Sequence, residues 1–152
     1  MRYTHTNINS PDWRRLSNFY KTVFGCRSLK PRDLGGDFFE RLTALTGAHV
    51  EGEHILLPGY GEDGPTFEIF TYTPAGDQAP AKVNDCGFAH VAFEVDNVRE
   101  TLQKLLENGG SQLGEVMTTF YPFEQLWLTL VYAKDPDGNI VEIQRWHQEE
   151  NE

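Results

Sequence analysis

The sequence predicts an α+β fold in which two copies of a βαβββ module follow one another along the chain. This prediction depends on an internal repeat and on the spacing of apolar residues. A strand-like segment at Tyr3–His5 recurs at Phe88–His90, and in both copies a helical pattern follows and stops at a glycine, Gly25 or Gly110. Both pairs of equivalent residues lie 85 positions apart. We therefore expect the second module to repeat the design of the first.

A second segment recurs near the end of each copy. Asp63-Gly64 and Asp137-Gly138 each precede a strand pattern that contains a glutamate, and they lie 74 positions apart. Asp-Gly pairs are typical of tight turns before a strand. The shorter offset means that the first copy holds 11 additional residues. We place them between Leu34 and Pro58, where Asp37–Leu45 has a helical pattern.

Each copy has one principal helix with recognisable ends. In the first copy Ser10 is the expected N-cap, Pro11 the first helical residue and Gly25 the stop. In the second copy we expect Asp96 to be the cap and Gly109-Gly110 to end the helix. The apolar residues at helical spacing are Trp13, Leu16, Phe19, Tyr20, Val23 and Phe24 in the first copy and Val98, Leu102, Leu105 and Leu106 in the second.

Three strands are expected after each principal helix, and the two copies are joined by a linker. Residues 74–85 are rich in Pro, Ala, Gly and Asp, which is typical of a connecting segment. We predict a single domain with module 1 at 1–73, module 2 at 86–147 and an acidic, frayed tail at 148–152. The expected strands are 27–32, 50–57 and 66–72 in the first copy and 112–118, 126–133 and 140–146 in the second.

Composition and charge exclude several classes of protein. Apolar runs fall far short of the roughly 20 residues that cross a bilayer, and the N-terminus lacks a signal-peptide pattern, so we expect a cytoplasmic protein. A net charge of −10 makes nucleic acid and anionic membranes poor partners. We expect a small-molecule partner instead. Cys26 and Cys86 indicate neither a disulfide framework nor a thiol metal site.

Four polar residues occupy matching places in the two copies. Side chains alternate between the two faces of a strand, so His5, Glu68, His90 and Glu142 are all expected to point away from the face that packs on a helix. A pseudo-twofold axis between the modules would bring them to one point. Two imidazoles and two carboxylates suit one divalent ion of Zn, Ni, Co, Mn or Fe.

Simpler interpretations of these residues stay open. A lone histidine in a strand is usually only half buried, and a lone glutamate on a sheet is usually solvated. The matched pairs make coincidence a weaker explanation. Three further histidines lack a counterpart in the other copy and are expected at the surface or in loops: His49, His54 and His147. Six aromatic residues either line a cleft or belong to the core: Phe38, Phe39, Tyr60, Tyr121, Phe123 and Trp127.

These motifs resemble the vicinal oxygen chelate superfamily, which groups glyoxalases, bleomycin resistance proteins and extradiol dioxygenases. The resemblance runs from His5 to Trp146, and its strongest pieces are Asn18–Gly25, Gly87–Val95 and Asp135–Glu142. It implies paired βαβββ modules whose mixed sheets curl around one metal cleft, and a homodimer. Its dioxygenases and fosfomycin resistance enzymes use two histidines and one carboxylate.

The fourth donor, Glu68, makes the site more similar to glyoxalase I and methylmalonyl-CoA epimerase. The pattern departs from them at Asn9, where bacterial glyoxalase I usually carries an arginine that helps to hold glutathione. The resemblance implies a lyase, isomerase or epimerase that moves a proton next to a carbonyl or thioester through a metal-stabilised enolate. Glu142 is the expected base, with help from Glu68.

Two other classes of function stay open on the same fold. One is a different metalloenzyme, either an extradiol-type dioxygenase or a thiol transferase that modifies an antibiotic. The other is a non-catalytic protein that binds a small molecule and confers resistance.

Overall fold

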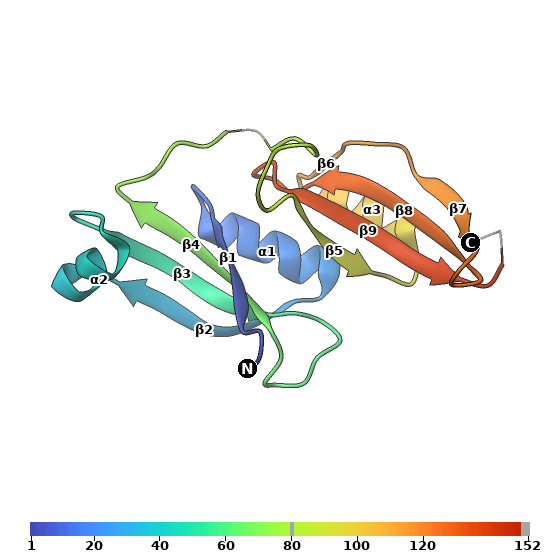
Figure 1. Cartoon of the computed structure of the whole chain (residues 1–152). Coiled ribbons are helices and arrows are strands. Elements are labelled where there is room, and N and C mark those ends of the chain that lie inside the picture. Colours follow the sequence, from blue (N-terminus) through green and yellow to red (C-terminus); the bar gives the residue numbers. More distant parts are fainter. Residues whose placement is uncertain (80, 150–152) are drawn as a thin grey trace. The chain divides into compact units, whose positions relative to one another are not determined.

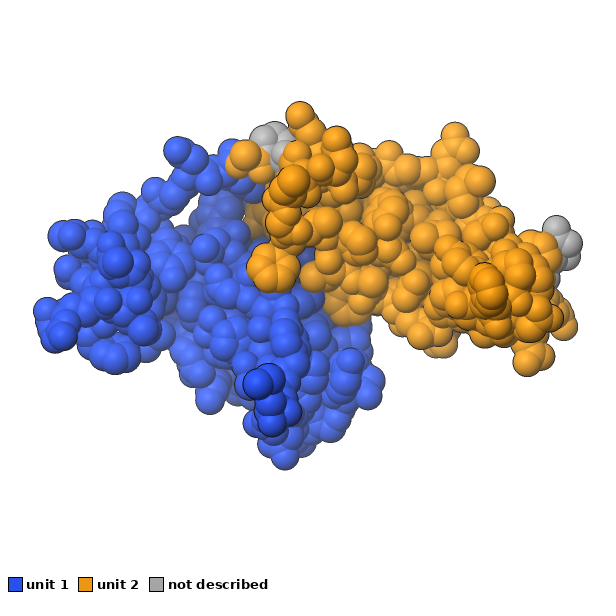
Figure 2. All heavy atoms as spheres, viewed as in Figure 1, with its two compact units in different colours: residues 1–78 blue, residues 79–152 orange. Residues whose placement is uncertain are grey.

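The computed structural model describes residues 1–79 and 81–149, and it divides into two compact units, Met1–Gln78 and Ala79–Glu152 (Figures 1 and 2). The end of the predicted tail, residues 150–152, lies outside the described residues. Each unit has one mixed sheet with a long helix on one face. The predicted α+β class and the repeated module are therefore confirmed.

Unit 1 contains β1 (His5–Asn9), α1 (Trp13–Phe24), β2 (Arg27–Leu34), α2 (Gly36–Thr43), β3 (His49–Leu56) and β4 (Thr66–Thr73). The strand order is β1-β4-β3-β2, with β1 parallel to β4 and the other pairs antiparallel. A parallel neighbour requires a long crossover, which the elements between β1 and β4 supply.

Helix α1 packs on β3 and β4 through the apolar stripe predicted from the sequence (Figure 1). Leu16 and Tyr20 are fully buried, and the ring of Tyr20 contacts Phe67 of β4 edge-on. Because side chains alternate along β4, Phe67 and Ile69 face α1 while Glu68 faces the opposite side. Glu68 thus lies on the face of the sheet that α1 does not cover.

The additional helix α2 belongs to that opposite face. Its Phe39 is buried with Ala48, Val50 and Phe70, and Tyr72 packs against this cluster. In the register of β3 and β4, Val50 lies opposite Tyr72, and His54 lies opposite Glu68 further along. Helix α2 therefore covers one end of the face that bears Glu68 and leaves the other end uncovered by it.

Unit 2 repeats this plan with β5 (His90–Glu94), α3 (Val98–Glu107), β6 (Ser111–Gln112), β7 (Met117–Tyr121), β8 (Leu126–Lys134) and β9 (Ile140–His147). The strand order is β5-β9-β8-β6, and β7 also pairs with β8. Strand β5 is parallel to β9, as β1 is to β4. Helix α3 packs on β8 and β9.

Three details differ from the sequence prediction. The helix caps are Asp12 and Asn97, whose side chains accept hydrogen bonds from Arg15 N and Glu100 N, so the predictions of Ser10 and Asp96 were wrong. Pro11 consequently precedes the helix.

The predicted strand 112–118 is two strands. Leu113 and Gly114 both donate their backbone N–H to the single carbonyl of Tyr132 on β8. This shared acceptor interrupts the pairing with β8 after β6 ends and before β7 begins.

The additional residues of unit 1 are also divided between two places. His54 precedes Glu68 by 14 residues, whereas Tyr132, its counterpart opposite Glu142, precedes that residue by 10. Four of the 11 residues therefore lengthen the loop between β3 and β4, and the rest lie before His54, in the region of α2. The prediction had placed all of them before Pro58.

Gly52 allows β3 and β4 to approach each other closely. A Cβ at this position would lie 2.0 Å from the carbonyl oxygen of Ile69 and 2.5 Å from a ring carbon of Phe70. Only glycine fits such a distance between backbone and side chain. The two strands can therefore meet tightly just before His54 and Glu68.

No helix in the described ranges is both long and apolar enough to cross a bilayer.

Candidate metal-binding half-sites

Unit 1 brings His5 and Glu68 together on the face opposite α1. His5 begins β1, and its Nε2 lies 3.6 Å from Oε2 of Glu68 in the parallel neighbour β4. Asn7, also on β1, donates from Nδ2 to the same oxygen at 3.4 Å. The His5 side chain is 42% exposed and that of Glu68 is 17% exposed, so the pair is open on the imidazole side.

A third residue of unit 1, His54 on β3, also contacts Glu68. Its Nε2 lies 2.9 Å from Oε1 of Glu68, and its Nδ1 lies 3.0 Å from the hydroxyl of Thr66. His54 is buried, and its ring meets that of His5 edge-on with 5.6 Å between centroids. The prediction that His54 lies at the surface or in a loop was therefore wrong.

The surroundings of His54 disfavour its charged form. Burial lowers the pKa of His54. The negative charge of Glu68 acts in the opposite direction, but the positive charge of Arg32 and the neighbouring His5 lower this pKa further. The net direction is downward, which keeps the ring neutral at physiological pH.

Unit 2 contains the matching pair of His90 and Glu142. Nε2 of His90, on β5, lies 3.2 Å from Oε2 of Glu142 on β9. Tyr132 of β8 lies directly opposite Glu142 and hydrogen-bonds to it, and its ring is 5.1 Å from that of His90. Burial raises the pKa of the Tyr132 phenol, and the bond to Glu142 raises it further, so this hydroxyl remains a donor.

The strand registers show that the two His–Glu pairs, each of which we call a half-site, are equivalent. Asn7 is paired with Glu68, and Ala92 is paired with Glu142, so each histidine lies two residues before the partner of its glutamate. On the other side of each glutamate the paired residue is His54 in unit 1 and Tyr132 in unit 2. Comparison of identical residues could not reveal His54, because its counterpart has a different side chain.

The other residues that the sequence analysis placed outside the metal site make separate contacts or lie exposed. His49 pairs with Asp33 at 2.7 Å, and His147 contacts the hydroxyl of Thr129 at 2.9 Å. Of the six aromatic residues considered for a cleft, Phe39 is core, Trp127 is partly buried, and the other four are exposed: Phe38, Tyr60, Tyr121 and Phe123.

Each unit offers two donors whose spacing suits one divalent ion. Within the described residues, no three His, Cys, Asp or Glu side chains form a complete metal site. Nitrogen and oxygen donors about 2.0–2.2 Å from one ion lie roughly 3 to 3.5 Å from each other. The separations of 3.6 and 3.2 Å in the two pairs are close to this range. The two donors within each pair therefore have a spacing that fits neighbouring ligands of a metal.

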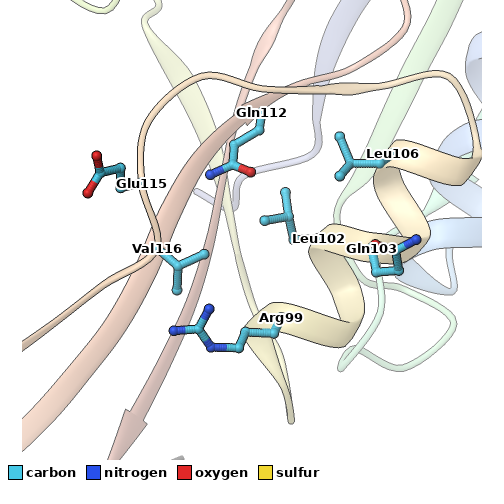
Figure 3. A pocket seen from close by; sticks show the side chains of 7 residues that line it. All are labelled: Arg99, Leu102, Gln103, Leu106, Gln112, Glu115 and Val116. Atoms are coloured by element: carbon cyan, nitrogen blue, oxygen red, sulfur yellow. The ribbon is translucent and has the colours of Figure 1, made fainter.

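A separate hollow of about 330 Å³ lies beside α3 in unit 2 (Figure 3). Leu102 and Leu106 of the helix line it, together with Gln112 of β6 and Val116 of the following loop. None of the predicted ligands lines this hollow. It lies beside the helix that covers the other face of the sheet, so we assign it no part in the candidate site.

The profile of the glyoxalase/bleomycin resistance protein/dioxygenase superfamily matches residues 2–143. This chain belongs to that superfamily. The match spans both half-sites.

Superfamily members of similar sequence are named as enzymes. A lactoylglutathione lyase from Escherichia coli O157:H7 is 26% identical over 145 residues, covering 94% of this chain and 91% of the relative. A lactoylglutathione lyase from Neisseria meningitidis serogroup A is 23% identical over 144 residues, covering 94% and 89%.

Solved structures share the superfamily fold. A glyoxalase family protein from Bacillus cereus has a TM-score of 0.77 at 20% identity, with 97% of this chain and 93% of that chain covered. The fosfomycin resistance protein FosX from Listeria monocytogenes, in complex with Mn(II) and sulfate, has a TM-score of 0.55 at 16% identity, with 98% and 95% covered. At these identities the likeness shows the fold alone.

Proposed function

We propose that this superfamily member is a divalent-metal-dependent lyase, isomerase or epimerase of the glyoxalase type. Its reaction is the transfer of a proton on a carbon next to a carbonyl or thioester. The observation that carries the proposal is the His–Glu pair at the same strand register in both units. The names of the curated relatives support the same reaction class.

In this proposal His5, Glu68, His90 and Glu142 hold one ion of Zn, Ni, Co, Mn or Fe. The donor set is nitrogen and oxygen, which such ions accept. The Mn(II) complex of the Listeria protein is consistent with a divalent ion on this fold. A bound ion would supply positive charge next to the carbonyl oxygen, where negative charge develops as the proton leaves, and such charge is worth several kcal/mol.

Glu142 is the proposed base. Its carboxylate is buried, which limits competition from water, and the Tyr132 hydroxyl donates to it. A carboxylate so placed can accept the proton from the substrate carbon and return it. Delivery of a proton to the opposite face of the same carbon gives epimerisation, and return to the neighbouring carbon gives isomerisation. Glu68 assists from the second half-site, while His5 and His90 keep their places.

Elemental analysis of the purified protein tests the metal. We expect about one divalent ion per chain and loss of most of it in His90→Ala. His49→Ala is the matched control, since His49 pairs with Asp33 outside the half-sites, and it should keep its metal. Absence of binding by Mn²⁺, Co²⁺, Ni²⁺ and Zn²⁺ at any tested concentration would refute the proposal.

A substrate panel then tests the reaction. Hemithioacetals and acyl thioesters should exchange the proton next to the carbonyl with D₂O, and chelation should stop the exchange. Oxygen uptake with catechols and Fe²⁺ would favour a dioxygenase instead, and tight ligand binding that chelators leave unchanged would favour a binding protein. We further propose a homodimer, which light scattering of the purified protein checks.

A further inference from the structure

We infer that His54 is a positioning residue that holds Glu68 in place and leaves only one of its carboxylate oxygens for a metal. This inference rests on the proposed function, because it concerns a ligand of the proposed ion. No resemblance between the two copies indicates it, since Tyr132 occupies the corresponding place in unit 2.

The orientation of His54 follows from its two hydrogen bonds. The Thr66 hydroxyl lies 3.0 Å from Nδ1, and Oε1 of Glu68 lies 2.9 Å from Nε2. A carboxylate can only accept, so Nε2 must carry the proton that it donates to Glu68. Nδ1 of the neutral ring is then an acceptor, which the Thr66 hydroxyl satisfies. Thr66, His54 and Glu68 thus form one directed chain.

The backbone keeps this chain rigid. His54 lies directly opposite Glu68 in the antiparallel pair of β3 and β4, and Thr66 is two residues before Glu68 on the same face. Both His54 and Thr66 are buried. A side chain fixed at both ends within a sheet loses little further freedom when its partner binds a ligand, which is the general requirement of a preorganised site.

The two carboxylate oxygens of Glu68 consequently have different partners. Oε1 is engaged by His54, whereas Oε2 lies 3.6 Å from Nε2 of His5 and 3.4 Å from Nδ2 of Asn7. Oε2 is therefore the oxygen next to the other unit 1 donor. Glu68 binds through Oε2 alone, with its direction fixed by His54.

Co²⁺ affinity in three variants tests this role. His54→Leu removes the donor, and we expect it to weaken Co²⁺ binding about 10- to 100-fold in competition with a chelator. His54→Gln keeps an N–H that can reach Oε1, so it should restore affinity to within a few-fold of the wild type. His49→Leu is the matched control, since His49 pairs with Asp33 outside the half-sites, and it should leave Co²⁺ affinity unchanged.

The Co²⁺ absorption spectrum distinguishes a positioning residue from a ligand. We expect both His54 variants to keep the wild-type number of nitrogen donors. A loss of one nitrogen donor would make His54 a ligand itself and overturn the inference, as would unchanged affinity in His54→Leu or equal losses in the Leu and Gln variants.

A measurement on the metal-free wild type needs no variant to fold. Nitrogen NMR shifts should show His54 as the neutral Nε2–H tautomer, and Glu68→Gln should shift its Nε2 signal. The Nδ1–H tautomer would overturn the inference. If the wild type binds no metal but has the Nε2–H tautomer, the proposed function fails while the hold of His54 on Glu68 stands.

Discussion

Units 1 and 2 share a frame but differ in the residues that surround it. Their helices begin at Trp13 and Val98 after caps at equivalent positions, and their His–Glu pairs have the same register. The 13 basic and 23 acidic residues of the chain divide into 8 and 10 in unit 1 and 5 and 13 in unit 2, which gives net charges of −2 and −8. The two copies thus retain their donor pairs while their charge has diverged.

The contact between helix and sheet has diverged as well. In unit 1, Ser17 and Lys21 of α1 donate to the buried carboxylate of Glu53 on β3, and the Lys21 bond is 2.9 Å long. The equivalent residues in unit 2 are Leu102, Leu106 and Val131. The same packing position accepts either a polar network or an apolar one. The residues between helix and sheet can therefore change from polar to apolar without loss of the fold. The His–Glu pairs on the opposite face are the same in both units despite this change.

The largest expected effect separates the two glutamates. Glu142→Gln should lower turnover about 10²- to 10⁴-fold, because an amide cannot accept the proton. Glu68→Gln should lower it only about 10-fold, since the amide that replaces this carboxylate keeps one oxygen for the metal but loses the charge and the second oxygen, which accepts from His54. Steady-state kinetics on the best substrate of the panel, with metal content measured in parallel, makes the comparison. A larger loss in Glu68→Gln would reverse the assignment of the base.

The second prediction concerns the polar contact of unit 1. Glu53→Ala should lower the free energy of unfolding by about 2–3 kcal/mol, because it leaves Lys21 and Ser17 without their buried acceptor. Urea denaturation followed by circular dichroism measures this loss.

Transplanting the unit 2 residues provides the control for that loss. The triple variant Ser17→Leu, Lys21→Leu and Glu53→Val should lie within about 1 kcal/mol of the wild type or above it, since apolar replacement of a buried ion pair is often neutral or stabilising. A triple variant as unstable as Glu53→Ala would show that the polar contact itself is required in unit 1.

The pH dependence of stability provides a third comparison. Burial raises the pKa of Glu53, but hydrogen bonds from Ser17, Lys21 and Ser28 outweigh it, and the pKa is lowered from its ordinary 4.5. The contribution of Glu53 is thus fully present above pH 4.5 and is lost as the pH falls through the lower folded-state value. The stability difference between wild type and Glu53→Gln should therefore shrink below pH 4.5. A difference that grows there would contradict the sign.

The smallest effect concerns the two thiols. Cys26 in unit 1 is buried, and burial raises the pKa of its thiol to about 12, whereas Cys86 in unit 2 is exposed. Iodoacetamide at about pH 8 should label Cys86 alone in the native protein and both thiols in urea. Cys86→Ser should abolish native labelling and change stability by less than about 0.5 kcal/mol. Mass spectrometry of the labelled peptides would reveal any native reaction at Cys26.

The repeat made most of the fold predictable from the sequence, and the predicted pairs His5–Glu68 and His90–Glu142 lie in contact. The helix caps were missed because Ser10 and Asp12 are both good capping residues, and only backbone geometry decides between them.

His54 was missed for a different reason. A strand register is set by pairing across the sheet, so the neighbour of Glu68 on β3 depends on loop lengths between distant segments. The two copies differ in those loop lengths. The division of 112–118 into two strands likewise depends on the carbonyl of Tyr132, which lies far along the chain.

Gly52 has no functional group, yet it controls the distance between the two strands that carry His54 and Glu68. Any side chain there would collide with the carbonyl of Ile69 and force β3 and β4 apart. This separation would occur two residues before His54, which pairs with Glu68. A random mutagenesis screen that scores the loss of bound cobalt should accordingly return Gly52→Ala among its hits. The contact between His54 and Glu68 therefore depends on how closely two backbones can approach. Only the hydrogen atom that is the side chain of glycine permits that distance.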